Sequence, residues 1–224
     1  MEKVNIRYVL VWSGWLRLCH WVIAFGVLFQ IFSAWAADHD FVDPAFWYDW
    51  HIIVGQVVLV ALIVRIILLF TAGSSHWRSL IPKRSQFDGI LKMIKFYLSL
   101  ARAPLPNWYA HNPFWQPIYI IFLFVLLGCS ISGFLNNSTY LLAGFPMKTV
   151  HAVLATIIVI FTVGHIATTF LHDLKGKGAF ISAIINGYRY FHVSNEVSTK
   201  PDILKNDSDV VVPIKQIIKK AEPR

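Results

Sequence analysis

Four long apolar stretches alternate with polar segments along the chain. They cover about residues 18–36, 50–70, 114–135 and 150–171, and each is about 20 residues long. A helix of about 20 apolar residues spans the hydrocarbon core of a bilayer, and no stretch shows the period-two alternation of a membrane β-barrel. The pattern predicts an all-α integral membrane protein, built as a bundle of four transmembrane helices.

A fifth periodic segment, Phe87 to Arg102, lies between the second and third apolar runs. Its basic residues fall away from an apolar helical face that consists of Phe87, Ile90, Leu91, Ile94, Leu98 and Ala101. This predicts a basic amphipathic helix on the cytoplasmic membrane surface, which ends at the prolines of APLP. A short surface helix is expected from about Ala179 to Ile185. We expect one domain over residues 1–192, followed by a polar, Lys-rich and mobile cytoplasmic tail at 193–224.

Lys and Arg residues gather in alternate connections. They precede the first run, occupy the segment between the second and third runs, and follow the fourth, whereas the first-to-second connection has four Asp and no base. Basic loops stay on the cytoplasmic side, so both termini are expected in the cytoplasm of a bacterium, with the chain in its inner membrane. This asymmetry accounts for the net charge of +8, and nothing indicates a nucleic-acid partner.

Four histidines lie within the predicted spans, at positions 20, 51, 151 and 165. His151 and His165 are fourteen residues apart, which in a helix is about 21 Å along the axis and within about 40° of one face. The alternating direction of the spans puts His20 and His165 near the cytoplasmic surface, and His51 and His151 near the outer surface. The histidines therefore form two pairs at two depths.

Intramembrane histidines are costly and usually functional. Two bis-imidazole sites across a bilayer are typical of two b-type haems, with His20 and His165 on the inner iron and His51 and His151 on the outer iron. Cys19 and Cys129 form no Cys-x-x-Cys-His motif, so the haems are expected to be non-covalent. A proton relay and a zinc site are the alternatives.

Further residues lie near the expected inner haem. Arg17 and Arg65 are candidate partners for the haem propionates, because guanidinium groups bind carboxylates bidentately. Candidates for quinone binding or for the inner-haem surroundings are His111, Asn112 and His172.

Several motifs resemble one known family. RLCHW (17–21), the histidine that opens the second span, AHNP (110–113), the two histidines of the fourth span and NGYR (186–189) are similar to the cytochrome b subunits of membrane-bound nickel–iron hydrogenases, within the bacterial cytochrome b561-like group. The resemblance implies a diheme electron-transfer subunit of a quinone-reactive oxidoreductase complex. It also implies an outer-face partner, such as a hydrogenase small subunit.

Two alternatives remain open. The outer connections look shorter than those of typical hydrogenase subunits, so another dehydrogenase or a periplasmic c-type cytochrome is also a candidate partner. The second alternative is a stand-alone cytochrome b561-type oxidase, which would take electrons from superoxide or ascorbate and pass them to quinone.

Overall fold

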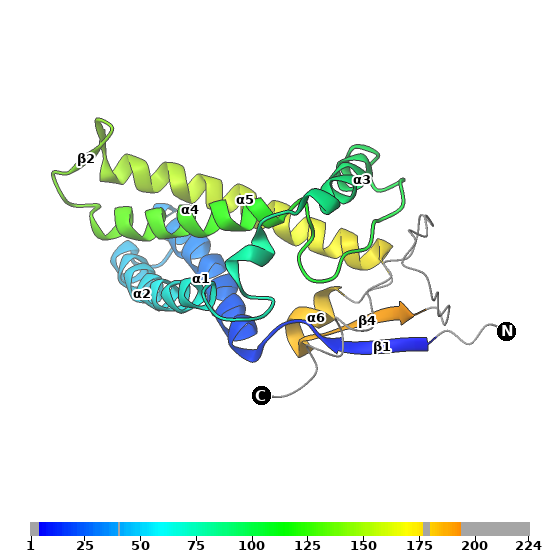
Figure 1. The fold of residues 1–224 in the computed structure, drawn as a ribbon. Helices are drawn as coiled ribbons and strands as arrows, with labels where there is room; N and C mark the ends of the chain where they lie inside the picture. Colours follow the sequence, from blue (N-terminus) through cyan, green and yellow to red (C-terminus); the bar gives the residue numbers. More distant parts are fainter. Residues whose placement is uncertain (1–4, 40, 177–179, 194–224) are drawn as a thin grey trace.

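Four long helices form the body of the protein. The computed structural model describes residues 5–39, 41–176 and 180–193, and Figure 1 shows how the elements are arranged. The helices α1 (Gly14–Asp38), α2 (Pro44–Leu68), α4 (Gln116–Phe134) and α5 (Met147–Lys175) are all long and apolar enough to cross a membrane. The predicted four-span helical architecture is confirmed.

The first two long helices, α1 and α2, begin where a polar side chain satisfies a free backbone amide. Ser13 caps α1 by accepting a hydrogen bond from the Leu16 amide at 3.3 Å, and Asp43 accepts from the Ala45 amide at 3.0 Å at the start of α2. Pro44 at the first position suits a helix N-terminus. α2 therefore starts six residues before the apolar run at position 50, because hydropathy marks only the part of a helix that lipid surrounds.

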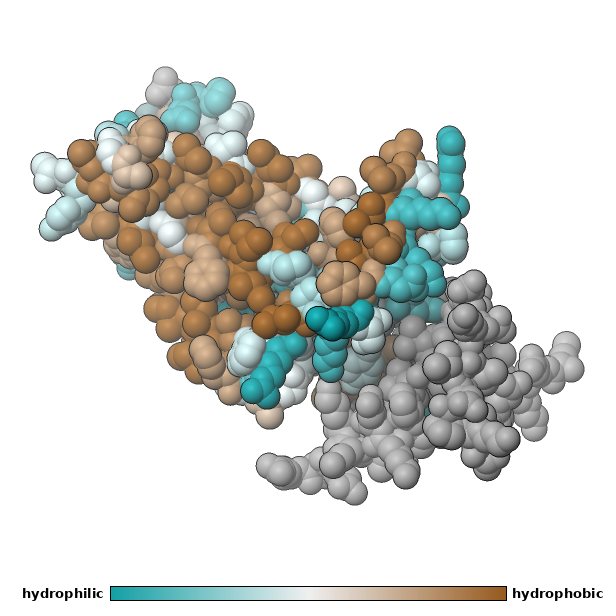
Figure 2. Space-filling view, turned by 45° about the horizontal axis from the view of Figure 1, so that its top comes forward, coloured by the Kyte–Doolittle hydropathy of each residue, from teal (hydrophilic) through white to brown (hydrophobic). Residues whose placement is uncertain are grey.

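The helices pack as two antiparallel pairs, α1 with α2 and α4 with α5, and α2 also contacts α4. α1 and α2 approach closely at Gly26, where a Cβ atom would clash with Val58 Cγ2. The bundle core holds Val27, Leu62, Leu126, Cys129 and Ile158. The outer surface of the helices is broadly hydrophobic (Figure 2), as a bilayer requires.

Smaller elements gather at the two ends of the bundle (Figure 1). The end that we call the α3 end carries η1 (Trp77–Leu80), η2 (Arg84–Gln86), α3 (Phe87–Leu98), α6 (Phe180–Asn186) and an antiparallel ribbon of β1 (Asn5–Leu10) with β4 (Tyr188–Val193). The opposite end, here the hairpin end, carries β2 (Leu141–Leu142) paired with β3 (Phe145–Pro146). The helix α6 confirms the short helix expected near residues 179–185. The ribbon of β1 and β4 was not predicted, because most of the sequence separates its two strands.

The amphipathic helix α3 exists but is shorter than predicted. It ends at Leu98 rather than at Arg102, because Leu100 and Ala101 take left-handed φ values of 52° and 61°. Ala101 is then buried with Met93, Phe96 and Trp108 in a second core. Phe87, Leu91 and Leu98 of the predicted apolar face remain exposed, as suits a membrane surface. The predicted tail lies outside the described residues beyond Val193.

Candidate functional site

His51 and His151 meet at the hairpin end. Their ring centres are 6.3 Å apart and the ring planes make an angle of 75°. We call them the hairpin-end pair. His51 lies in α2 and His151 near the start of α5, so the α2–α4–α5 packing brings together residues that are a hundred positions apart.

Each ring of the hairpin-end pair has a partner for its Nδ1 atom. The Ser33 hydroxyl donates to the Gln30 carbonyl at 3.2 Å, so it accepts from His51 Nδ1, 2.9 Å away. His151 Nδ1 lies 2.9 Å from the Cys129 carbonyl and donates to it. Protonated Nδ1 atoms leave Nε2 of both rings unprotonated and able to bind a metal.

Two glycines allow this arrangement. A Cβ atom on Gly133 would lie 3.0 Å from His151 Cε1, so the α4 backbone approaches the ring as closely as glycine permits. A Cβ atom on Gly55 would lie 2.8 Å from Gln30 Nε2, which donates to the His51 carbonyl at 2.8 Å. The supporting contacts of the pair thus come from α1, α2 and α4.

His20 and His165 meet at the α3 end. Their ring centres are 6.4 Å apart and their planes make an angle of 56°. We call them the α3-end pair. His165 stacks almost parallel on Phe161, with 5.5 Å between ring centres and 8° between planes. His20 packs edge-on to Trp21, and its buried Nδ1 has no hydrogen-bond partner among the described residues.

Both separations suit a metal ion between two rings. Imidazole nitrogen binds first-row metals at about 2 Å and lies roughly 1 Å from its ring centre, so two rings on opposite sides of one metal have centres about 6 Å apart. The observed values are 6.3 and 6.4 Å. A haem iron takes its other four ligands from the macrocycle, so two imidazoles complete its coordination. The residues present therefore fit a haem at each pair.

The two predicted propionate partners both lie near the α3 end. Arg65 is a partly buried arginine of α2 whose Nη1 has no partner among the described residues. Arg17 donates from Nη1 to the Ile185 carbonyl of α6, while its buried Nε has no partner among the described residues. Arg17 thus already ties α1 to α6, and each guanidinium group keeps a buried nitrogen that no described residue pairs.

His111 and Asn112 lie directly before α4. His111 packs edge-on to Trp12, and its buried Nδ1 has no partner among the described residues. Burial and the positive charge of Arg65 lower the pKa of His111 to about 3, so this ring is neutral at physiological pH. Asn112 shapes the turn into α4, since its Oδ1 accepts from the Phe114 amide at 3.0 Å.

His172 lies two turns beyond His165 and takes part in a chain of hydrogen bonds. Trp115 Nε1 donates to the Tyr97 hydroxyl at 2.7 Å, and this hydroxyl lies 2.8 Å from His172 Nε2. Burial raises the pKa of Tyr97 to about 12, so the hydroxyl stays protonated beside the His172 ring. The contact fastens α3 to α5, which makes His172 less available to a ligand than His111.

Arg189, the last residue of NGYR, has a structural role that the sequence did not reveal. Its Nη1 donates to the carbonyls of Trp108 and Tyr109, both at 2.8 Å, and its guanidinium lies 4.3 Å from the Phe180 ring centre. Burial lowers its pKa to about 10. Arg189 thus holds the loop before α4 against α6 and β4, and thereby supports His111.

Comparison with known proteins shows which family the chain resembles. The family model of prokaryotic cytochrome b561 matches residues 11–187, a range that contains all four paired histidines. The chain is 26% identical over 216 residues to a probable Ni/Fe-hydrogenase B-type cytochrome subunit of Bradyrhizobium diazoefficiens, which covers 82% of this chain and 86% of that protein.

Two further relatives have similar names. The chain is 26% identical over 223 residues to the probable Ni/Fe-hydrogenase B-type cytochrome subunit of Rhizobium leguminosarum, which covers 85% of this chain and 92% of that one. It is 26% identical over 174 residues to the probable Ni/Fe-hydrogenase 1 B-type cytochrome subunit of Escherichia coli, at 67% and 72% coverage.

Proposed function

The chain belongs to the prokaryotic cytochrome b561 family, and we propose that it carries electrons between a redox protein on the outer face of the bacterial inner membrane and the quinone pool. Family membership and the four spans make it a multi-pass membrane cytochrome with b-type haem. Beyond this, we propose that the chain binds two haems through the four paired histidines, exchanges electrons with quinone and has a redox partner on the outer face.

The observation that carries the proposal is the presence of two similar histidine pairs at opposite ends of one bundle. His151 and His165 are fourteen residues apart on α5, so the two sites lie about 21 Å apart along that helix. Haem supplies reversible one-electron chemistry when bound. His20 with His165, and His51 with His151, would each hold one haem through two imidazoles, an arrangement that would favour electron transfer over oxygen binding.

The α3 end supplies the groups that a quinone and the haem propionates need. Arg65 Nη1 and Arg17 Nε are buried cationic nitrogens without partners among the described residues, which suits them to carboxylates. The neutral His111 ring and the adjacent Asn112 offer polar atoms to a quinone carbonyl, whereas His172 is engaged by the Tyr97 hydroxyl.

The positive-inside asymmetry supports a cytoplasmic location for the α3 end and for both termini. The hairpin end then faces outward, where its histidine pair receives or donates electrons. The names of the relatives support a nickel–iron hydrogenase as the outer partner.

Purification in mild detergent, together with quinone reduction by native membranes, tests this function. We expect a hydrogenase to co-purify with the chain, and hydrogen-dependent quinone reduction to fall at least tenfold in His51→Ala. His39→Ala, in an exposed histidine beyond α1, is the matched control and should keep full activity. Turnover of superoxide or ascorbate by the isolated chain, with no co-purifying partner, would instead favour the stand-alone oxidase.

A further inference from the structure

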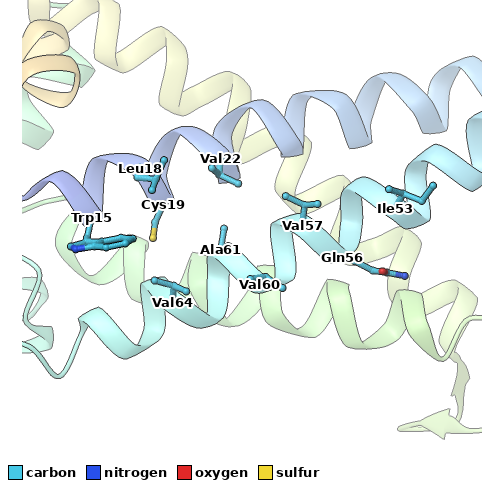
Figure 3. Close-up of a pocket in the computed structure, with 10 residues that line it drawn as sticks. All are labelled: Trp15, Leu18, Cys19, Val22, Ile53, Gln56, Val57, Val60, Ala61 and Val64. Atoms are coloured by element: carbon cyan, nitrogen blue, oxygen red, sulfur yellow. The ribbon is translucent and has the colours of Figure 1, made fainter.

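A groove of about 530 Å³ opens between α1 and α2 on the outer surface of the bundle. Figure 3 shows its length, with Trp15 and Val64 at one end and Ile53 and Gln56 at the other. Its lining is almost wholly apolar, as expected of a surface that faces lipid. The amide of Gln56 is the exception.

Gln56 lies at the centre of a membrane-spanning helix. It is twelve residues from Pro44 and twelve from Leu68, the two ends of α2, and therefore about 18 Å from each end. Its side chain is exposed and forms no hydrogen bond within the described part of the chain. By contrast, Gln30 of α1 donates to the His51 carbonyl, and Gln116 of α4 is buried.

An amide in this position requires a partner. Hydrocarbon offers no hydrogen bonds, so an unpaired amide there costs several kcal/mol by transfer measurements. Gln is also too short to reach the headgroups from the middle of the bilayer. The lipid chains around α2 therefore do not satisfy Gln56.

The exposed residues around Gln56 are spaced as in a helix–helix interface. Ile53, Val60 and Ile67 follow one another at seven-residue intervals and are 49%, 62% and 58% exposed. Gln56 and Ile63 lie between them, which gives the alternating three- and four-residue steps of a heptad pattern. Neither α1 nor α4 covers this row, so it is free to contact another helix.

We propose that this face of α2 is the contact between two copies of the chain, related by a twofold axis along the membrane normal, with their Gln56 amides hydrogen-bonded to each other. Two copies inserted in the same orientation place Gln56 at the same depth. An amide carries both a donor and an acceptor, so an identical amide satisfies it. A different helix would need its own polar group at that depth. A lipid chain has none.

Cysteine cross-linking of the full chain in native membranes tests the contact. Cys19 and Cys129 are buried, so the wild-type chain gives the background level of disulfide-linked dimer. On mild oxidation, Val60→Cys should give a disulfide-linked dimer. The matched control is Ile160→Cys, which places a cysteine at similar depth on α5, where Ile160 is 68% exposed; it should stay at the background level. No dimer from Val60→Cys, equal dimer from both variants, or a link from Val60→Cys to a different protein overturns the proposal.

Sedimentation equilibrium in mild detergent tests the role of the amide. Gln56→Leu should weaken self-association about threefold to thirtyfold, the usual range for a hydrogen bond between membrane helices. Gln56→Asn, which keeps an amide, should lose less. Both variants should keep the haem spectrum of the wild type, which shows that they are folded. An unchanged dimer constant in a folded Gln56→Leu variant overturns the proposal, and neither test depends on the haem count or the quinone.

Discussion

The two histidine pairs have almost the same separation but different surroundings. In the hairpin-end pair, His51 and His151 both have hydrogen-bonded Nδ1 atoms, at 2.9 Å from the Ser33 hydroxyl and from the Cys129 carbonyl. In the α3-end pair, His165 rests on the Phe161 ring and His20 Nδ1 has no partner among the described residues. Polar groups hold the first pair, and aromatic packing holds the second.

This difference indicates two different tasks. A hydrogen bond to Nδ1 fixes the orientation of a metal-binding imidazole and raises its basicity, so the protein itself completes the hairpin-end pair. A buried polar atom without a partner costs about 1–3 kcal/mol, and the α3 end has several, on His20, His111 and Arg65. These unpaired atoms support the proposal that quinone and haem propionates bind at the α3 end.

Removal of one ligand from each pair should have the largest effect. His151→Ala should remove the low-spin signal of the hairpin-end haem and leave the other intact, while His165→Ala should do the reverse, because the two sites share α5 but no ligand. Paramagnetic resonance of each purified variant measures both signals. Loss of the same signal in both variants would show that the pairing is wrong.

Gly133→Ala is a smaller change beside His151, and it should alter the signal of the hairpin-end haem alone. In Gly133→Ala the new Cβ would lie 3.0 Å from His151 Cε1, so the ring must move by a few tenths of an ångström. The g values of the hairpin-end haem should shift while those of the α3-end haem stay constant. Gly128→Ala, on the same helix, makes only an ordinary contact of 3.4 Å with Leu154. If this control shifts the signal equally, the close approach at Gly133 has no special role.

The sequence predicted the depths of the histidines in the membrane better than the hydrogen-bond partners of their rings. Helical spacing and the alternating direction of the spans predicted which histidines share a depth, and the structure brings each of them next to that partner. These quantities depend only on regular helix geometry. The Ser33 and Cys129 contacts depend on how α1 and α4 rotate against α2 and α5, which hydropathy does not specify.

The same limit applies at the α3 end. Basic composition and periodicity predicted α3, but its last turn depends on Leu100 and Ala101, whose left-handed conformations no local pattern indicated. The pairing of β1 with β4 and the contacts of Arg189 join distant segments. Such contacts follow from tertiary packing, so a single sequence contains no local sign of them.

Loss of one hydrogen bond should have the smallest effect. Ser33→Ala removes the acceptor of His51 Nδ1, worth about 1 kcal/mol, and makes this imidazole a weaker electron donor to iron. The midpoint potential of the hairpin-end haem should therefore rise slightly, with no change at the α3 end, in a redox titration followed by absorption. Ser130→Ala is the control, because the Ser130 hydroxyl only donates to the Leu126 carbonyl of its own helix. An equal rise at both haems would contradict the local role of Ser33.

The haem content of the pure chain tests the central claim most directly. Two histidine pairs, each spaced for one iron, predict two non-covalent haems per polypeptide. A pyridine haemochrome assay, set against the protein concentration from amino-acid analysis, should give a b-type spectrum and a ratio of about two. A ratio of one in fully loaded protein, or a c-type spectrum, would contradict the account.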